Sequence, residues 1–299
     1  KLAMAESSSL KENQSNISSQ TEPTLVAQLL EEVVDEKRIQ YKTRASDILL
    51  VVNPVARSKF AAVNPNELRR SLSNLIDNSI EASTEGDRVE ITLQSLGQSI
   101  RIGIADHGYG IAEEHLSRIG DKGFTKNKPS GTGIGVHYAK RAVASWNGKI
   151  EYESVVGTGT NVTIHLPSAP SPSWFLDDLR FDCYSTVVIV DDDPTIHSVW
   201  QERLATSSSQ ISVEHFFDAE SAASWAIQNR DSASKCLLLT DFNLNSRTGT
   251  GLTVLERFGL QHPAAVMVTN AFNDADLRRR CENMNVKIMP KTMMGVATF

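Results

Sequence analysis

The sequence is poor in the features that mark secreted and membrane-spanning proteins. Its three cysteines lie far apart and show no CxxC spacing, which argues against a disulfide framework and against a zinc site. No apolar run approaches the roughly 20 residues needed to cross a bilayer, and the start lacks a basic segment followed by an apolar stretch. We therefore expect reduced thiols and a cytoplasmic chain without a membrane segment, although a longer parent protein can still be membrane-anchored.

Clustered positive charge is also scarce. The formal net charge is -6, and Arg278 to Arg280 form the only dense basic run. A nucleic-acid-binding surface needs clustered Lys and Arg to contact phosphates, so we expect no nucleic-acid partner. The basic run itself is interpreted as a solvated helix face.

The length of 299 residues predicts two domains, because one domain usually takes about 150 residues. Residues 1–22 include serine runs and are too polar to bury, so we expect a flexible tail there. A stretch rich in Pro and Ser, Pro167 to Pro172, favours extended backbone and predicts the domain boundary. The expected organisation is one domain over 23–167, a linker over 168–184 and a second domain over 185–299.

The first half mixes helical and strand patterns. Apolar residues spaced by three and four predict a helix from Pro23. A second helix has a clear start signal, because Asn64 can cap it, Pro65 takes the first helical position and Glu67 fits a capping box. The expected strands are 47–52, 89–93, 100–105, 149–155 and 161–166, and a third helix is expected over 136–146.

In the second half, short apolar strands alternate with helical patterns. This alternation is typical of a parallel, doubly wound α/β sheet. The expected strands are 187–190, 211–217, 237–240, 264–268 and 286–289.

Polar residues recur along one face of the helix from Pro65. They are spaced at i, i+3, i+4 and i+7, opposite an apolar face, and they are Asn74, Asp77, Asn78 and Glu81. A hydrated cation that bridges phosphates needs oxygen ligands, and a neutral Asn amide supplies one without repelling an anionic substrate. Taken alone, the stripe also fits a solvated helix face.

Two glycine-containing segments follow. Asp106 ends a strand before Gly108 and Gly110; its carboxylate can accept from an exocyclic amine, and the glycines let backbone approach a purine. The run from Gly131 to Gly135 opens a helix, where free backbone amides and the positive helix end suit phosphates. Each segment alone is weak evidence, since an Asp in a turn is often only turn chemistry.

The order and spacing of these segments make the set specific. Four segments resemble the N, G1, F and G2 boxes of histidine kinases, and they are Asn74 to Ala82, Asp106 to Gly110, Gly123 to Thr125 and Gly131 to Gly135. The resemblance covers about residues 23–167. It implies a two-layer α/β sandwich of the histidine kinase, gyrase and MutL ATPase type, with ATP between the sheet and a mobile lid.

The same resemblance implies roles for single residues. Asn78 is expected to bind Mg²⁺, and Asn74 to contact a phosphate or the metal. Asp106 is expected to bind the adenine amino group, with the Thr160 hydroxyl beside the adenine. Lys128 is the expected lid contact to the terminal phosphates, with Lys126 as the alternative. The remaining implied ATP-binding positions are Gly108, Gly110, Gly131, Gly133 and Gly135.

One position departs from the ATP-hydrolysing members of this superfamily. They use a glutamate base four residues before the metal-binding Asn, and Asn74 takes that position here. An amide cannot remove a proton from water, so transfer of the phosphoryl group to a partner side chain is favoured over hydrolysis.

Carboxylates follow two predicted strands of the second half. Asp191, Asp192 and Asp193 follow the first strand and Asp241 follows the third; in a parallel sheet, both strand ends lie at one edge. The carboxylates would repel one another without a cation, which favours bound Mg²⁺ that also shields an incoming phosphoryl group. Asp193 by itself is better explained as a helix cap before Pro194.

With Thr269 after the fourth strand and Lys291 after the fifth, this half resembles response-regulator receivers from about Ser185 onward. The resemblance implies a flavodoxin-like fold in which Asp241 accepts the phosphoryl group. It implies Mg²⁺ bound by Asp191, Asp192 and Asp241 with the backbone carbonyl of Asn243. Thr269 is implied as the hydrogen-bonding switch and Lys291 as the phosphate counter-ion.

The second half departs from the receiver pattern in several places. Ile288 stands where an aromatic residue is usual, Asn270 replaces a small residue, and Pro290 precedes Lys291 instead of following it. Output switching is therefore expected to be unusual. Residues 292–299 are too few for the last receiver helix, so one flank of the sheet is expected to be bare or covered by another chain.

The histidine that such kinases phosphorylate is missing. The first histidine is His107, within the nucleotide loop, so the dimerising hairpin is absent from this sequence. His197, on the first receiver helix, is expected at the surface or in an interface.

The leading hypothesis is therefore the ATP-binding and receiver part of a hybrid histidine kinase. It would phosphorylate a histidine on the hairpin of a homodimeric parent, and the phosphoryl group would then reach Asp241 and a downstream phosphotransfer protein or response regulator. The alternative is a regulatory module in which ATP and phosphorylation only control protein contacts, and a slow phosphatase or ATPase is a third hypothesis.

Overall fold

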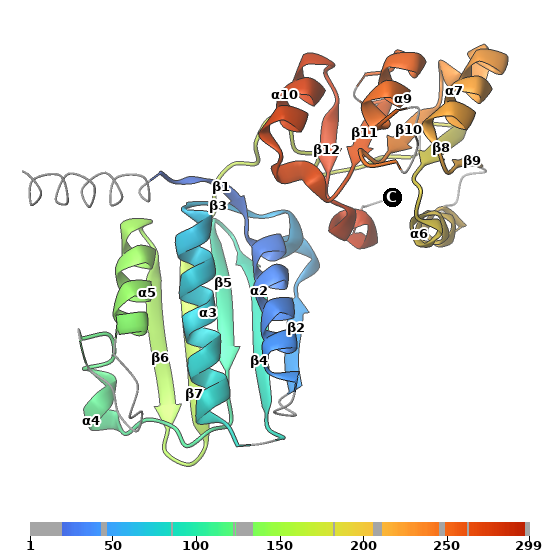
Figure 1. Cartoon of the computed structure of the whole chain (residues 1–299). Coiled ribbons are helices and arrows are strands. Elements are labelled where there is room, and N and C mark those ends of the chain that lie inside the picture. The colour runs from blue at the N-terminus through green and yellow to red at the C-terminus, as the bar shows by residue number, and fades with distance from the viewer. Residues whose placement is uncertain are drawn as a thin grey trace, which may run out of the picture. The chain divides into compact units, whose positions relative to one another are not determined.

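The computed structural model describes residues 20–42, 47–84, 86–121, 123, 134–181, 183–205, 211–244, 249–261 and 263–296. The chain divides into two compact units, Lys1–Ser171 and Pro172–Phe299. Figure 1 shows a mixed sheet with helices in the first unit and a parallel sheet with helices in the second.

The first unit is built on a five-stranded sheet in the order β2-β4-β5-β7-β6. Strand β2 runs parallel to β4, and the other neighbours are antiparallel. The strands are β2 (Asp47–Val52), β4 (Arg88–Leu96), β5 (Ser99–Ala105), β6 (Lys149–Val155) and β7 (Gly159–Pro167). Helices α2 (Val26–Gln40), α3 (Pro65–Ala82) and α5 (Ile134–Ser145) lie side by side on one face of this sheet (Figure 1).

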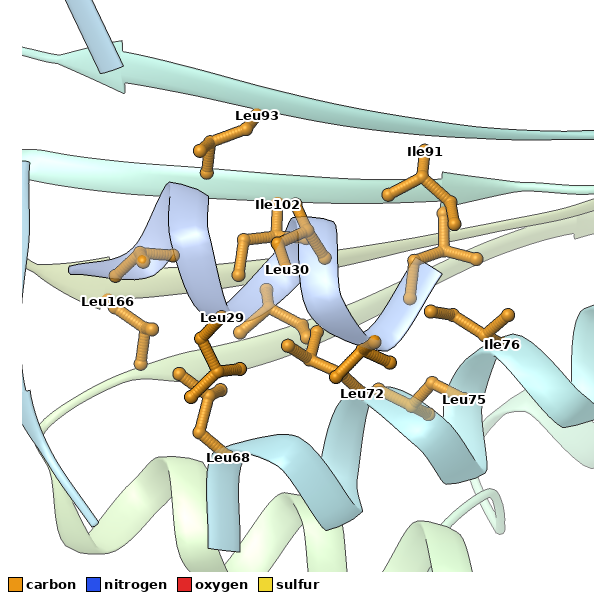
Figure 2. Packing of buried hydrophobic residues seen from close by; sticks show 14 of the residues in the cluster. Leu29, Leu30, Leu68, Leu72, Leu75, Ile76, Ile91, Leu93, Ile102 and Leu166 are labelled. Carbon is orange, nitrogen blue, oxygen red and sulfur yellow. The ribbon is translucent and has the colours of Figure 1, made fainter. Parts of the chain in front are cut away.

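The core of the first unit lies between these helices and the sheet. The apolar face of α3 points inward, with Leu68, Leu72 and Ile76 fully buried. Figure 2 shows these side chains in one cluster with Leu30 of α2 and the strand residues Ile91, Leu93 and Ile102. Each side chain of this size contributes roughly 1.5–3 kcal/mol when fully buried, so the amphipathic pattern of α3 fixes which of its faces remains for chemistry.

The start of α3 confirms the predicted cap. The side chain of Asn64 accepts a hydrogen bond from the backbone N of Glu67 at 3.0 Å, and Pro65 is the first helical residue. This bond satisfies one of the four backbone donors that a helix start leaves unpaired. The helix that leads to Asn74 and Asn78 is thus anchored at its first turn.

The prediction of a helix from Pro23 was wrong at its start. Residues Glu22–Leu25 form strand β1, which pairs antiparallel with β3 (Phe60–Val63), and α2 begins at Val26. The residue before a proline avoids helical backbone, and β3 offers partners for an extended segment. The sequence patterns did not predict β3, the 3-10 helix η2 (Pro54–Ser58) or the short helix α4 (Glu113–Leu116).

The second unit is a parallel sheet in the order β12-β11-β10-β8-β9. Starting from the β9 edge and numbering the strands from the first strand of this unit, the order is 2-1-3-4-5, which is the order of doubly wound sheets of the flavodoxin type. The strands are β8 (Thr186–Val190), β9 (Ser212–Phe216), β10 (Leu237–Thr240), β11 (Ala265–Val268) and β12 (Lys287–Met289). The helices are α6 (Pro194–Ala205), α7 (Ala219–Gln228), α8 (Arg230–Ala233), α9 (Gly251–Phe258), η3 (Ala271–Asn273), α10 (Ala275–Asn283) and η4 (Lys291–Val296).

Residues 172–181, which we predicted as part of a linker, belong to the second unit. The backbone of Ile288 in β12 donates to Trp174 O at 2.8 Å and accepts from Leu176 N at 2.9 Å, so this segment adds to the outer edge of the sheet. Phe181 packs against Trp200 of α6, with ring centroids 6.0 Å apart. Trp174, Phe175 and Phe181, which follow the Pro and Ser run, are all buried, so this segment carries core side chains.

The expectations of no membrane segment and of reduced thiols can be compared with the described residues. Within the described ranges, no helix is both long enough and apolar enough to span a membrane. Burial raises the pKa of the Cys236 thiol to about 12 and that of the Cys281 thiol to about 11. Both side chains are therefore protonated thiols at neutral pH.

Candidate functional sites

The polar stripe of α3 divides into two parts with different partners. Asn74 and Asn78 are half-buried, and Glu81 is exposed. A Cβ atom added to Gly135, near the start of α5, would lie 3.2 Å from Cγ of Asn74. The structure therefore brings Gly135, in the first turn of α5, against Asn74.

Asp77 faces a different partner, which the sequence analysis missed. Its carboxylate lies 2.7 Å from Nζ of Lys37 on α2, and the Tyr41 hydroxyl donates to it at 3.0 Å. The Lys37 side chain is only 6% exposed, so this ion pair is largely removed from water. Asp77 thus joins α3 to α2.

Asp106 directly follows β5 and is a buried carboxylate held by backbone amides. Its Oδ1 accepts from Gly108 N at 3.0 Å and from Thr160 N at 3.1 Å. Burial raises the pKa of the Asp106 carboxyl, and the hydrogen bonds from Gly108 and Thr160 offset this only in part. When ionised, the side chain offers acceptors only, which suits an exocyclic amine.

Thr160 is connected to the same residue through the backbone. It accepts from Asp106 N at 2.9 Å through its carbonyl, and its hydroxyl lies 2.9 Å from Oγ of Ser154 on β6. Asp106, which directly follows β5, and Thr160 of β7 are far apart in sequence but lie next to each other in the fold.

The glycines around Asp106 have a structural cause that sequence analysis did not give. A Cβ at Gly108 would lie 2.3 Å from Ala82 O, and one at Gly110 would lie 2.1 Å from Val155 O. Gly110 also has a φ of 67°, a left-handed conformation that favours glycine. The loop after Asp106 thus packs its backbone directly on the end of α3 and on the β6–β7 connection.

The predicted lid residues Lys126 and Lys128 and the predicted ATP-binding residues Gly131 and Gly133 lie outside the described residues. The described segment before them is held by α5. His137 Nδ1 lies 2.8 Å from Gly120 O, and Lys140 Nζ donates to Ile119 O. Helix α5 therefore fixes residues 119–120 beside its first turns.

A second site lies at the carboxyl ends of the parallel strands in the second unit. Asp191 and Asp192 follow β8, and Asp241 follows β10, the neighbouring strand. Carboxylate oxygens from these three residues lie within 4.8 Å of one another. Hard oxygen donors at this spacing suit a hard divalent cation such as Mg²⁺, so these residues fit the metal that the resemblance implies.

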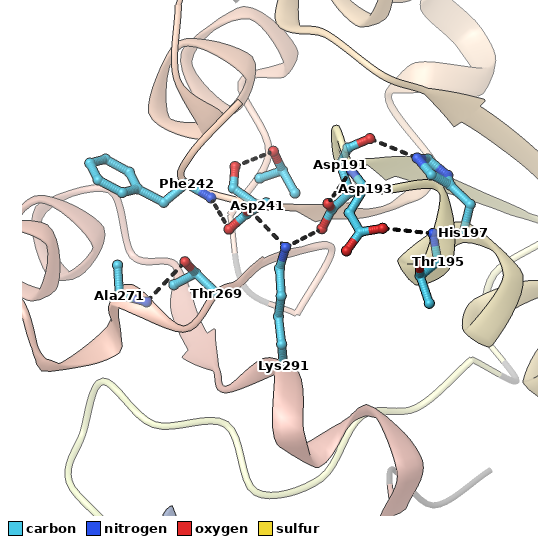
Figure 3. A network of polar contacts seen from close by, with 10 residues as sticks. Asp191, Asp193, Thr195, His197, Asp241, Phe242, Thr269, Ala271 and Lys291 are labelled. Atoms are coloured by element: carbon cyan, nitrogen blue, oxygen red, sulfur yellow. Dashed lines mark hydrogen bonds and ion pairs between the residues drawn. The ribbon is translucent and has the colours of Figure 1, made fainter. Parts of the chain in front are cut away.

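Lys291 lies between two of these carboxylates, as Figure 3 shows. Its Nζ is 2.7 Å from Asp191 Oδ2 and 2.9 Å from Asp241 Oδ2. Burial disfavours the charged ammonium, but the hydrogen bonds to Asp191 and Asp241 outweigh it, so the pKa of Lys291 is raised. Burial also raises the pKa of the Asp191 carboxyl, and the hydrogen bond from Lys291 offsets this rise only in part. The ammonium thus neutralises charge that would otherwise repel.

The other predicted residues of this half lie around the same sheet edge. Thr269, at the end of β11, is buried and its Oγ1 accepts from Ala271 N at 3.2 Å. Asn243 is exposed in the loop after Asp241. Asp193 accepts from Thr195 N at 2.8 Å, which confirms the predicted helix cap and lowers the pKa of the Asp193 carboxyl.

The prediction that His197 lies at the surface or in an interface was wrong. Its side chain is buried, and both ring nitrogens have partners. His197 lies in the first turn of α6, six residues after Asp191. Its ring points back toward the end of β8, which the neighbouring residues in the sequence do not predict.

Comparison with known proteins finds a family match within the first unit. Residues 63–170 match the family described as the histidine kinase-, DNA gyrase B- and HSP90-like ATPase. The sensor protein DegM of Bacillus sp. (strain B21-2) is 40% identical over 104 residues, which are 35% of this chain and 28% of that protein. The sensor-like histidine kinase SenX3 of Mycolicibacterium smegmatis is 28% identical over 162 residues, 52% of this chain and 42% of that protein.

The chain thus spans less than half the length of these curated relatives. Among solved structures, the mycobacterial sensor histidine kinase MprB aligns with 50% of this chain and 99% of its own, with 22% identity and a TM-score of 0.45. Full-length ShkA in complex with AMPPNP aligns with 91% of this chain and 54% of its own, with 18% identity and a TM-score of 0.44. Residues 63–170 therefore match an ATPase domain of the histidine kinase, DNA gyrase B and HSP90 type, and the curated relatives that share this part of the chain are sensor proteins and histidine kinases.

Proposed function

We propose that this chain is the ATP-binding and receiver part of a hybrid histidine kinase. The first unit binds ATP with Mg²⁺ and transfers its terminal phosphoryl group to a histidine on a dimerisation hairpin. The second unit then accepts that group on Asp241. Residues 23–167 would supply the kinase activity and residues 185–299 the receiver.

The observation that best supports the nucleotide site is the setting of Asp106. Two backbone amides hold its buried carboxylate, so its direction is fixed before any ligand binds. Asn74, Asn78 and Gly135 would bind the phosphate end, with Asn78 as the protein ligand to Mg²⁺. The ion would offset the negative charge of the phosphates.

Phosphoryl transfer fits the residues better than hydrolysis does. Asn74 stands at the position from which a base could remove a proton from water, and its amide cannot do so. The chain would therefore orient ATP for attack by a nitrogen of the partner histidine. In that step the bond from phosphorus to the histidine nitrogen forms, and the bond to the bridging oxygen of ADP breaks.

The second transfer is supported by the carboxylates with Lys291. An Asp241 oxygen would attack the phosphorus, the bond to the histidine nitrogen would break, and that nitrogen would leave with a proton. Mg²⁺ bound by Asp191, Asp192, Asp241 and the carbonyl of Asn243 would reduce the repulsion between two anions. Lys291 and Thr269 would then bind oxygens of the phosphoryl group.

The partners follow from this scheme. The hairpin of the parent protein, which would be a homodimer, supplies the histidine, and a phosphotransfer protein or response regulator would take the group from Asp241. The rival hypothesis is a regulatory module that binds ATP without using it.

Radiolabelled ATP with Mg²⁺ and a separately produced hairpin would test the scheme. We expect label on the hairpin histidine and then on this chain, and Asp241→Asn should abolish only the second step. Stable binding of ATP without transfer to the hairpin or the chain would favour the regulatory module.

A further inference from the structure

The side chain of His197 connects α6 to the peptide between two acidic residues. Its Nε2 lies 2.7 Å from the backbone oxygen of Asp191 (Figure 3). That oxygen belongs to the peptide group joining Asp191 to Asp192, so its orientation affects both carboxylates. His197 is 6% exposed, and the ring of Phe217 lies against it with centroids 4.3 Å apart.

The partners of His197 define its tautomer. A carbonyl oxygen can only accept, so Nε2 must carry a hydrogen. In the neutral ring, Nδ1 is then an acceptor, and it lies 2.8 Å from Nδ1 of His215 on β9. His215 must therefore donate from Nδ1. The two rings form a chain of hydrogen bonds from β9 through α6 to the Asp191 carbonyl.

The backbone on both sides of this carbonyl is already restrained. Asp191 N donates to Phe216 O at 3.1 Å, and Asp193 N donates to Asp191 Oδ1 at 3.0 Å. The bond from His197 adds a restraint on the plane of the peptide itself. With the peptide in this orientation, carboxylate oxygens of Asp191, Asp192 and Asp241 all lie within 4.8 Å of one another.

We propose that His197 is a positioning residue for phosphorylation of Asp241. Its Nε2–H holds the Asp191–Asp192 peptide so that both carboxylates are preorganised for the divalent cation, and His215 holds His197 in the required tautomer. This inference rests on the proposed receiver function. His197 itself neither binds the cation nor receives the phosphoryl group.

Two substitutions of His197 separate positioning from simple packing. The amide nitrogen of Gln reaches about as far as Nε2, so His197→Gln can still donate to the Asp191 carbonyl. The amide of Asn reaches only about as far as Nδ1, so His197→Asn keeps a polar group near His215 but loses the bond to Asp191. A third variant, His215→Phe, removes the partner that fixes the tautomer.

The test uses the full chain with acetyl phosphate as phosphodonor and a titration of MgCl₂. In the reaction, an Asp241 oxygen bonds to phosphorus while the bond between phosphorus and the acetyl oxygen breaks and acetate leaves. The readouts are the initial rate of phosphorylation, the Mg²⁺ concentration for half-maximal rate, and the Mg²⁺ dissociation constant measured by calorimetry without phosphodonor, which should change in parallel. Asp241→Asn is the blank for phosphorylation, and thermal unfolding is the folding control.

We expect His197→Asn to raise the half-maximal Mg²⁺ concentration about fivefold to tenfold, the effect of losing one hydrogen bond. His197→Gln should stay within about twofold of the unsubstituted chain, and His215→Phe should fall between them. Equal behaviour of the Asn and Gln variants, whether both normal or both impaired, would overturn the positioning role. If the unsubstituted chain gains no phosphoryl group beyond the Asp241→Asn blank, the receiver function itself fails.

Discussion

The two units hold their central carboxylates in opposite ways. Asp106 is oriented by the backbone amides of Gly108 and Thr160, whereas Asp191 and Asp241 are bridged by the Lys291 ammonium. Neutral amides fix a direction without cancelling the charge, so Asp106 remains available as an acceptor. A lysine cancels charge and can exchange partners, so the second site can admit a cation or a phosphoryl group. The first arrangement suits recognition and the second suits reaction.

The largest expected effect separates the two sites completely. Asp241→Asn should abolish phosphorylation of the second unit by acetyl phosphate, because an amide oxygen is too weak a nucleophile to replace the carboxylate. Binding of ATP by the first unit should be unchanged. Mass spectrometry of the intact chain and calorimetric titration with nucleotide measure the two properties, and residual phosphorylation of the variant would place the acceptor elsewhere.

A substitution at Gly110 tests whether backbone packing fixes the first site. Gly110→Ala would place a Cβ atom 2.1 Å from Val155 O at a φ of 67°. We expect the unfolding free energy of the first unit to fall by about 3 kcal/mol, from overpacking and left-handed strain together. Gly97→Ala is the matched control, since its φ is 62° but nothing lies within 4 Å of its added Cβ. Equal losses in both variants would remove close packing as the cause.

Removal of the ammonium tests the second arrangement. Lys291→Met leaves Asp191 and Asp241 facing each other, and we expect it to lower the unfolding free energy of the second unit by about 2–3 kcal/mol without Mg²⁺. Added Mg²⁺ should stabilise this variant more than the unsubstituted chain, because the ion replaces the missing positive charge. Thermal unfolding with and without MgCl₂ measures the difference. The same stabilisation by Mg²⁺ in both proteins would contradict the account.

The smallest effect concerns the pH dependence of Asp106. Its folded-state pKa is raised above the ordinary 3.8 by burial, so the folded chain binds this proton more tightly than the unfolded chain does. The unfolding free energy should therefore fall as pH rises through the folded pKa. Asp106→Asn lacks this loss, so its stability relative to the unsubstituted chain should increase over the same pH range. Denaturant unfolding at a series of pH values measures it, and a pH-independent difference would refute the shift.

Periodicity and strand ends explain why much of both sites could be predicted. The apolar face of α3 fixes the direction of Asn74. The parallel strands β8 and β10 bring Asp191 and Asp241 to one edge of the sheet, independently of the loop conformations. Features that depend on contacts distant in sequence could not be predicted. The ion pair between Lys37 and Asp77, the burial of His197, and the pairing of residues 172–181 with β12 all need partners from another element.

Calorimetric titration with a non-hydrolysable ATP analogue and Mg²⁺, on this chain and on Asp106→Asn, tests the central claim most directly. The hydrogen bond to a charged acceptor is worth about 1.5–3 kcal/mol, so we expect the variant to bind about 10- to 150-fold more weakly while remaining folded. Equal binding by both proteins would show that Asp106 does not recognise the nucleotide, and no binding by either would contradict the nucleotide site itself.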